Sequence, residues 1–406
     1  MDQARAASVL LYGNKCALPG QRPEISDWDL LRFLHQNSTL VGLRKCHRVR
    51  FGPGIQVFAP AGEVRSVTFG GLCRCHSVWA CPRCAPAIRR GYAQDLASLL
   101  VPWIDGGHGL AFVTNTTRHH RTDSPKAVLK AVTAGWHSIV VDKSVRAWRR
   151  SHPFEYSRAT EITYGPNGGH PHLHSALAFE EPLSRDDARE LSDVLYRPWS
   201  SAMERAGFGT PRRDKGVHVV RADGGVSAYM TKVLGLADEM TRLDRKKRGA
   251  TEQPFDVLRR AYAGDASALI TWRDHEQATK GVRSLSFSKN FRSMLGAGVE
   301  LSEADALELG EGRGPLLGEI SGRTADLFAR HPRGYEIFLE TCSAGTVESF
   351  AAAAAMLRGT ASWELRDEVE FLHTGEHLPP DLVPAEFVVP DSLADELALD
   401  WRERAF

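Results

Sequence analysis

Three histidines alternate along one short segment, His170-Pro171-His172-Leu173-His174. Successive side chains of a β-strand point to opposite faces, so His172 and His174 would project from one face about 7 Å apart. His170 would share that face, although Pro171 disturbs the ladder beside it. An isolated His-x-His pair is more often a solvated or hydrogen-bonded strand feature than a metal site. A further ligand is therefore needed to support metal binding.

A β-hairpin would supply that ligand as a carboxylate. Ser157–Tyr164 and His170–Phe179 are predicted strands, joined by a glycine-rich turn. If the hairpin folds about Pro166-Asn167, Glu161 lies directly opposite His172 and on its face. Two imidazoles and one carboxylate with open coordination positions suit a divalent ion, Mg²⁺ or Mn²⁺, that also holds a phosphate oxygen. We therefore predict a catalytic metal site at Glu161 and the two alternating histidines.

Tyr229, in a predicted helix from Gly225 to Leu236, is the candidate nucleophile. Helical spacing places Lys232 one turn after Tyr229, on the same face. A phenol has a reference pKa of about 10, so it attacks phosphorus only when a nearby cation stabilises the developing charge. Tyr-x-x-Lys alone arises by chance in amphipathic helices, where the tyrosine anchors the core. The interpretation depends on the histidine strand upstream.

Clustered thiols indicate a second metal site. Five of the seven cysteines lie between residues 46 and 84, in a chain without a recognisable export signal, which favours metal binding over disulfides. Cys81-Pro82-Arg83-Cys84 is a C-x2-C knuckle that can grip a tetrahedral structural Zn²⁺. The candidates for the other two ligands are Cys75 together with one of Cys46, Cys73 and His76.

These motifs, taken in chain order, resemble the rolling-circle replication initiators of small plasmids of Gram-positive and actinomycete type, in the HUH endonuclease superfamily. The resemblance extends over roughly residues 44–295, and its histidine segment is the most specific part. The matching segments are Leu43–Cys46, Gly71–Cys84, Phe112–His120, Glu161–His174, Tyr229–Lys232 and Lys280–Ser288.

The resemblance implies an enzyme that nicks one DNA strand at a plasmid origin and rejoins it at termination. Its products would be a 5′-phosphotyrosyl adduct and a 3′-OH that primes a host polymerase, with a host helicase as a further partner. The implied roles are metal ligands for His172, His174 and Glu161, nucleophile for Tyr229, charge partner for Lys232, and zinc ligands for Cys46, Cys75, Cys81 and Cys84.

One position departs from the family pattern. Many relatives carry a glutamate four residues before the tyrosine, where it is thought to activate water at termination. This sequence has Gly225 there, and the nearest acid is Asp223. Either Asp223 serves in that role or termination follows another route.

Charge is distributed unevenly along the chain. The net charge is +1, but residues 296–406 hold 22 acidic and 8 basic residues, and residues 1–295 hold 28 acidic and 43 basic residues. This asymmetry is typical of a chain of which one part meets nucleic acid. The substrate strand would be single-stranded or extruded at the nick site. The candidate phosphate contacts are Arg212, Arg213, Lys215, Lys246, Lys247 and Arg248.

The elements that position these residues predict an α+β fold. The resemblance implies an HUH-endonuclease core with a central antiparallel sheet flanked by helices. We predict an N-terminal zinc-binding lobe (1–105), a nicking and joining domain (106–295) and an acidic helical C-terminal region (296–406). The other predicted elements are helices at Ala85–Leu100, Pro125–Trp148 and Arg185–Ala206, and strands at Gly109–Thr117 and Gly216–Arg221.

Composition bounds the alternatives. A hydrophobic fraction of 42% and a charged fraction of 25% exclude wholesale disorder, and no apolar window reaches the roughly 18 to 20 residues of a membrane span. We expect a cytoplasmic protein with no membrane partner. Two other functions remain open: an HUH transposase or relaxase, and a non-catalytic zinc-containing DNA-binding regulator whose histidines are structural.

Overall fold

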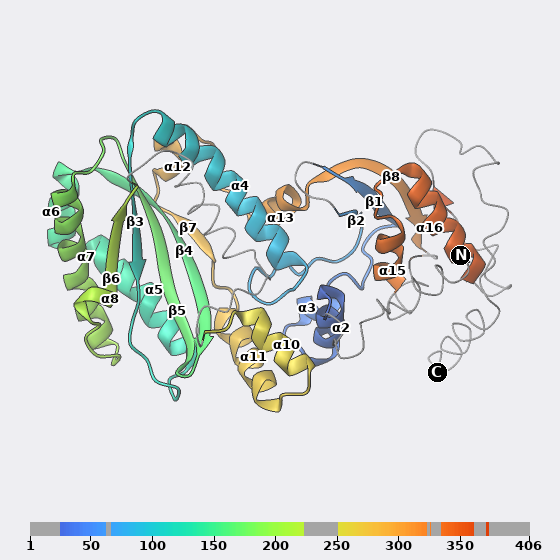
Figure 1. Cartoon of the computed structure of the whole chain (residues 1–406), viewed down its shortest axis with the longest axis horizontal. Helices are drawn as coiled ribbons and strands as arrows, with labels where there is room; N and C mark the ends of the chain where they lie inside the picture. The colour runs from blue at the N-terminus through green and yellow to red at the C-terminus, as the bar shows by residue number, and fades with distance from the viewer. Residues whose placement is uncertain are drawn as a thin grey trace, which may run out of the picture. The chain divides into compact units, whose positions relative to one another are not determined.

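The computed structural model describes residues 25–61, 66–222, 251–322, 325, 334–360 and 371–372 (Figure 1). The predicted tyrosine helix lies outside these residues, and so do Cys16 and the basic segment 246–248. The contacts divide the chain into two units, Met1–Cys75 with Glu311–Phe406, and His76–Gly310. These limits differ from the predicted three-part division, which stays a prediction.

The unit His76–Gly310 is built on a five-stranded sheet in which every pair of neighbours is antiparallel. In spatial order the strands are β6 (Val217–Arg221), β3 (Gly109–Asn115), β5 (Gly168–Phe179), β4 (Phe154–Gly165) and β7 (Leu285–Phe287). The strand that carries the histidines, β5, is therefore central. The prediction of an antiparallel sheet flanked by helices is confirmed.

One face of this sheet carries the main core of the unit. Odd-numbered residues of β5, among them Leu173 and Leu177, are fully buried there with Trp136 and Trp199. Figure 1 shows the three helices that cover this face, α5 (Pro125–Val141), α6 (Lys143–Ser151) and α7 (Arg185–Arg205). Each fully buried side chain of this size stabilises the fold by about 1.5–3 kcal/mol, which fixes the orientation of the strand.

The opposite face receives the even-numbered residues of β5. At one end, Ala176 and Ala178 pack against Leu99 and Leu100 of the long helix α4 (Cys84–Asp105) and against Phe291 of α12 (Phe291–Met294). Small alanines allow α4 to lie close to the sheet at that end. Toward the other end the same face carries the three histidines, all of them only partly buried. The alternation of β5 thus separates a core face from a polar, accessible one.

The predicted helix Pro125–Trp148 is wrong, because the chain breaks it in two. Asp142 ends α5 in an extended conformation, and its carboxylate accepts hydrogen bonds from the backbone N–H groups of Ser144 and Val145 at the start of α6. An aspartate competes with the helical backbone in this way and so favours a cap. The remaining described elements of this unit include α8 (Arg213–Gly216), α10 (Pro254–Tyr262), α11 (Ala266–Thr279) and the start of α13 (Glu303–Glu311).

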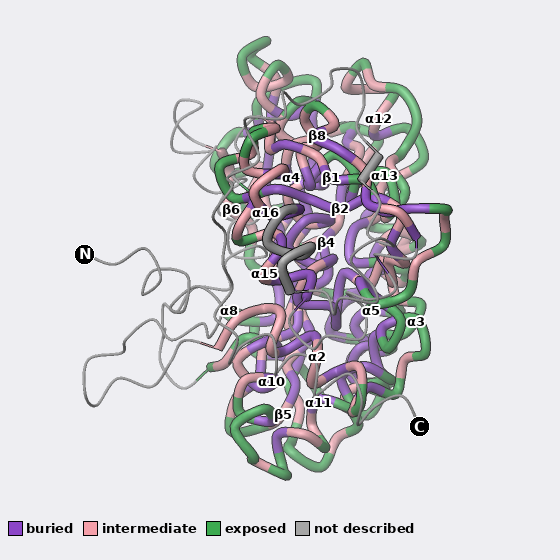
Figure 2. The backbone as a smooth tube through the Cα atoms, turned by 90° about the vertical axis from the view of Figure 1, so that its right-hand side faces the viewer, coloured by how far each residue is buried: buried purple, intermediate pink, exposed green. Residues whose placement is uncertain are grey.

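The other unit holds a four-stranded antiparallel sheet in the order β2 (Thr68–Gly70), β1 (Gly54–Pro60), β8 (Arg313–Ser321), β9 (Phe371–Leu372). Phe69, Phe338 and Phe350 are fully buried in its core, and β2 is buried along its whole length (Figure 2). Its helices are α2 (Asp27–Asn37), α3 (Val41–Lys45), α15 (Gly334–Thr341) and α16 (Val347–Thr360).

This sheet corrects the prediction of a purely helical C-terminal region. Helices α15 and α16 lie there as expected, but β8 is a nine-residue strand that pairs with β1. The acidic composition around it is typical of solvated helical faces. Its partner strand lies far away in the sequence, so no local pattern reveals the pairing.

Candidate metal centres

The β4–β5 hairpin brings three side chains together in the predicted register. The backbone pairs run from Phe154 with Phe179 to Gly165 with Gly168, and Glu161 lies opposite His172. The register predicted from the turn is therefore confirmed. A shift by one residue would have moved every side chain of the strand to the opposite face.

Glu161, His172 and His174 form a compact group. One carboxylate oxygen of Glu161, Oε2, lies 2.8 Å from Nε2 of His172 and 3.0 Å from Nε2 of His174. One ligand atom from each residue lies within 4.8 Å of the other two, so the group could hold a metal ion. Nitrogen and oxygen ligands bind a divalent cation at about 2.0–2.2 Å, and small movements of these side chains would admit one.

The other ring nitrogens have their own partners. Nδ1 of His172 lies 3.2 Å from the backbone carbonyl oxygen of His170, and Nδ1 of His174 lies 3.2 Å from Oγ1 of Thr114 on β3. A carbonyl oxygen only accepts hydrogen bonds, so Nδ1 of His172 carries a proton. Nε2 donates to the carboxylate of Glu161, and a bound metal ion would replace that proton. Partners of this kind orient the histidines of metal sites and fix their tautomers. Thr114 is a part of the site that the motif analysis did not single out.

Electrostatics keep the carboxylate charged. Burial alone would raise the pKa of Glu161, but the hydrogen bonds and charges of His172 and His174 outweigh burial, and the pKa lies well below its usual value. Burial, with the charges of His172 and His119, lowers the pKa of His170 to about 4. The carboxylate is therefore anionic and available as a ligand for a cation that displaces the imidazole protons.

A second cationic group belongs to this environment. Arg89 of α4 donates a hydrogen bond from Nη2 to the backbone oxygen of Val78 at 3.1 Å. Burial lowers its pKa to about 10, while the charge of Glu161 acts in the opposite direction. Arg89 thus stays protonated at neutral pH and adds positive potential near the carboxylate. The sequence showed it only as one charge of a predicted helix.

A cavity of about 390 Å³ adjoins the histidine strand at His170. Its walls are the β3–α5 loop at residues 117–120, the β4–β5 turn at residues 165–168, His170 and Thr251. The rings of His119 and His170 stack in it with centroids 4.8 Å apart, and their Nδ1 atoms are 3.2 Å apart. The motif Phe112–His120 therefore meets the histidine segment in space.

Three of the predicted phosphate contacts lie close together. Arg212, Arg213 and Lys215 are exposed around α8. The hydroxyl of Thr116 donates to the backbone oxygen of Lys215 and its N–H donates to that of Gly216, which ties α8 to the end of β3. Asn115 at that end pairs with Leu173 of β5, so these cations lie at the same end of the sheet as the histidines. Arg212 pairs with Asp214 at 2.7 Å and Arg213 with Asp193, so phosphates would have to compete with carboxylates there.

Some predicted site residues lie outside the described residues. They are Tyr229, Lys232, Asp223, Gly225, Lys246, Lys247 and Arg248. Their roles stay predictions.

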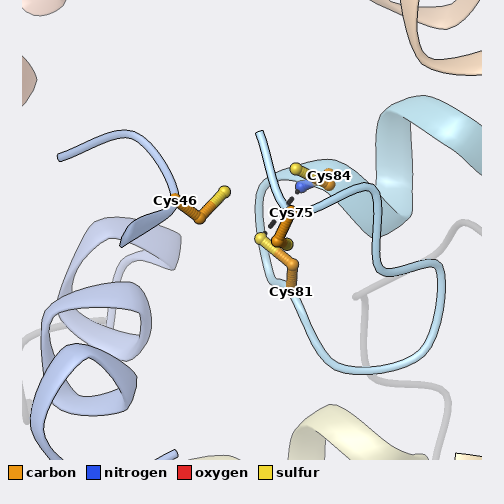
Figure 3. Close-up of side chains that lie close together, drawn as sticks. All are labelled: Cys46, Cys75, Cys81 and Cys84. Atoms are coloured by element: carbon orange, nitrogen blue, oxygen red, sulfur yellow. Dashed lines mark hydrogen bonds between the residues drawn. The ribbon is translucent and has the colours of Figure 1, made fainter. Parts of the chain in front are cut away.

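A second group that could hold a metal ion consists of four thiols, Cys46, Cys75, Cys81 and Cys84, whose sulfur atoms lie within 4.8 Å of one another (Figure 3). Cys46 ends α3, and Cys84 begins α4, where its N–H donates to Sγ of Cys81 at 3.3 Å. Four Zn–S bonds of about 2.3 Å in a tetrahedron would bring the sulfur atoms somewhat closer together than 4.8 Å. All four potential ligands are cysteine sulfurs, which is a common ligand set of structural zinc, so the group fits zinc.

Two alternative ligands take no part in that group. Cys73 and His76 are absent from it, although both precede the knuckle closely. The backbone of Cys73 bonds to Val49 and His47, which fixes its main chain in the adjoining turn. The two sets, of thiols and of imidazoles with a carboxylate, are the groups of three or more such ligands found among the described residues.

Comparison with known proteins gives one informative match. A protein called "Protein rep" from Streptomyces lividans is 26% identical over 308 residues, an alignment that covers 59% of this chain and 67% of that protein. No family model matches the chain, and no solved structure does. In the part of the chain that the structure describes, no helix combines the length and the apolar character needed to cross a membrane.

Proposed function

We propose that this chain is a plasmid replication initiator that nicks one DNA strand at the origin and later rejoins it. The observation that carries the proposal is the convergence of His172 and His174 on one oxygen of Glu161, on a central strand whose His170 lines a cavity. Similarity to the Streptomyces "Protein rep" supports the assignment to replication. The antiparallel sheet is compatible with an HUH-endonuclease core.

The three ligands would hold Mg²⁺ or Mn²⁺. When bound, the ion would polarise the scissile phosphate and offset the charge that develops on its oxygens. The chain's own residues prepare this site: the carbonyl of His170 and the hydroxyl of Thr114 orient the imidazoles, and Arg89 adds positive potential. Side chains of the three ligands are 12–21% exposed, which leaves them accessible to a substrate strand.

Tyr229 is the proposed nucleophile, with Lys232 as its charge partner. The phenol loses its proton as its oxygen bonds to phosphorus, and the bond from phosphorus to the 3′ oxygen breaks. That oxygen takes up a proton and becomes the 3′-OH primer, while the 5′ phosphate stays on the tyrosine. The new phosphodiester retains the energy of the old one, so the reverse reaction rejoins the strand without ATP.

The remaining parts of the proposal concern partners and the second metal. Cys46, Cys75, Cys81 and Cys84 would hold a structural Zn²⁺. The substrate would be single-stranded or extruded origin DNA, with host helicase and polymerase acting after the nick in the cytoplasm. The exposed cations at Arg212, Arg213 and Lys215 would contact its phosphates, together with residues 246–248.

A nicking assay tests this function directly. We expect the purified chain with Mn²⁺ or Mg²⁺ to nick supercoiled plasmid that carries its origin, and to leave a covalent DNA–protein species on a denaturing gel. Tyr229→Phe should abolish both products, and mass spectrometry of the adduct should identify the Tyr229 peptide. Cleavage without any adduct would indicate hydrolysis instead. Binding without cleavage under every metal condition would favour a DNA-binding regulator.

A further inference from the structure

The segment that surrounds Cys46 has an unusual charge distribution. From Leu30 to Gly62 the sequence contains no aspartate or glutamate, but it holds five lysine or arginine residues. Arg44, Lys45 and Arg48 are exposed. None of the ion pairs found among the described residues involves these three side chains. A local patch of positive charge results.

The backbone holds these cations on a compact turn. The N–H groups of Arg48 and Val49 both donate to the carbonyl oxygen of Lys45, at 3.2 and 3.1 Å. His47 takes a left-handed conformation with φ of 53°, and its N–H donates to the oxygen of Cys73 at 2.8 Å. Because Cys46 is fully buried at the same place, the turn keeps its sulfur inward while Lys45 and Arg48 stay exposed.

Apolar side chains are exposed among these cations. Phe51 is 71% exposed, Val41 58% and Val49 41%, although residues of these types are usually buried. The N–H of Phe51 donates to the oxygen of Gly71 at 3.1 Å, so its backbone is anchored while its ring is open to solvent. We call the set Val41, Arg44, Lys45, Arg48, Val49 and Phe51 the α3 surface.

We propose that the α3 surface binds single-stranded DNA, as a contact additional to the Glu161 centre. Its cations match the phosphates, and an exposed aromatic ring beside them offers a platform on which an unpaired base can stack. Duplex DNA has no free base face to offer, so the exposed phenylalanine favours the single strand. The inference rests on the proposed function for the choice of DNA as the polyanion.

The test is fluorescence anisotropy with labelled oligothymidylate and the full chain, without added Mg²⁺ or Mn²⁺. This probe has no nick sequence, so strand cleavage does not affect the result. The variants are Phe51→Ala and the triple change Arg44→Gln, Lys45→Gln and Arg48→Gln. Matched controls are Val299→Ala, at an exposed apolar residue, and Arg189→Gln, at an exposed cation.

We expect Phe51→Ala to weaken binding at least about fivefold, the lower range for loss of one stacked base. The triple variant should bind more weakly and lower the slope of log affinity against log salt by about 2, since each phosphate contact on a single strand contributes about 0.7. The controls should bind like the parent chain. Zinc content and thermal unfolding show whether each variant is folded, and Phe51→Ala removes only an exposed ring.

Unchanged oligothymidylate affinity in both folded variants, or an equal loss in the controls, would overturn the proposal. A duplex of the same length that binds more tightly than the single strand would also reject it. Failure of the proposed function is seen separately, as absence of the covalent adduct on origin DNA, and leaves the oligothymidylate result interpretable.

Discussion

The two candidate metal groups are built in opposite ways. Glu161, His172 and His174 come from paired strands of one hairpin, where the backbone ladder sets their spacing. The four cysteines come from helix ends and turns between residues 46 and 84, such as the end of α3 and the start of α4. The sheet can therefore hold the first group in place without an ion. Loops and helix ends have no such ladder, so a bound ion would contribute more to fixing the second group.

The two candidate metal groups also differ in how far their side chains are exposed. Cys46, Cys81 and Cys84 are fully buried, which suits a closed structural site. The imidazoles and the carboxylate of the other group stay accessible beside a cavity, which suits a site that exchanges substrate. Loss of a cysteine should therefore affect folding, while loss of a strand ligand should affect metal binding and chemistry.

The largest expected effect is on stability, from Cys81→Ser. Where metal binding is coupled to folding, loss of a zinc ligand removes folding free energy, and we expect a loss of more than about 3 kcal/mol. Thermal unfolding and zinc content measure it, with a chelator reproducing the effect on the parent chain. Cys73→Ser is the matched control, because Cys73 is close in sequence but outside the group. Equal unfolding temperatures for the two variants would remove the contrast between the groups.

Glu161→Gln should leave stability nearly unchanged but weaken metal binding and nicking. The amide keeps the shape and can still hydrogen-bond one imidazole, so we expect the free energy of unfolding to change by less than about 1 kcal/mol. Loss of the anionic ligand should lower Mn²⁺ affinity and reduce nicking by about 100-fold or more. Calorimetric titration with Mn²⁺ and the nicking assay measure this. Glu155→Gln, on the same strand but paired with Arg149 at 2.7 Å, should leave Mn²⁺ affinity unchanged.

His275, outside the strand group, is a histidine with no capacity left for a metal. His275 is 1% exposed, Nδ1 lies 2.9 Å from the Tyr164 hydroxyl, and Nε2 lies 3.2 Å from the backbone oxygen of Trp79. The carbonyl fixes the proton on Nε2, so Nδ1 accepts from Tyr164. Burial lowers the pKa of His275 to about 4. It is a structural histidine, in contrast to His172.

Because His275 is buried in its neutral form, the free energy of unfolding should fall in acid. Above pH of about 6.5, His275 is neutral whether the chain is folded or unfolded; as pH falls below that value, the unfolded chain binds a proton that the folded chain excludes. Stability should therefore fall by about 2 kcal/mol between neutral pH and pH 4.5. Denaturant unfolding of the parent chain and of His275→Gln gives the difference, which should shrink in the variant. His137→Gln, at an exposed residue, should leave the slope unchanged; if His275→Gln behaves like it, His275 is not held neutral.

Local patterns predicted the hairpin site well. The turn at residues 165–168 is short, the strands alternate clearly, and one register follows, so Glu161 meets His172 as expected. What failed depends on distant partners: β8 forms its strand against β1, and Thr114 reaches His174 only through the pairing of β3 with β5. The break at Asp142 was local and could have been found from its capping chemistry.

Thr114→Val should give the smallest effect, because it removes only one orienting contact. Valine keeps the shape and the strand preference of threonine, but Nδ1 of His174 loses its partner at 3.2 Å. Partners of metal-bound histidines contribute about tenfold or more to affinity, so we expect Mn²⁺ to bind about tenfold more weakly, with little change in unfolding. Thr163→Val, on β4, serves as the control. If both valine variants bind Mn²⁺ alike, the sheet backbone alone orients His174, and the hydroxyl of Thr114 contributes nothing to metal binding.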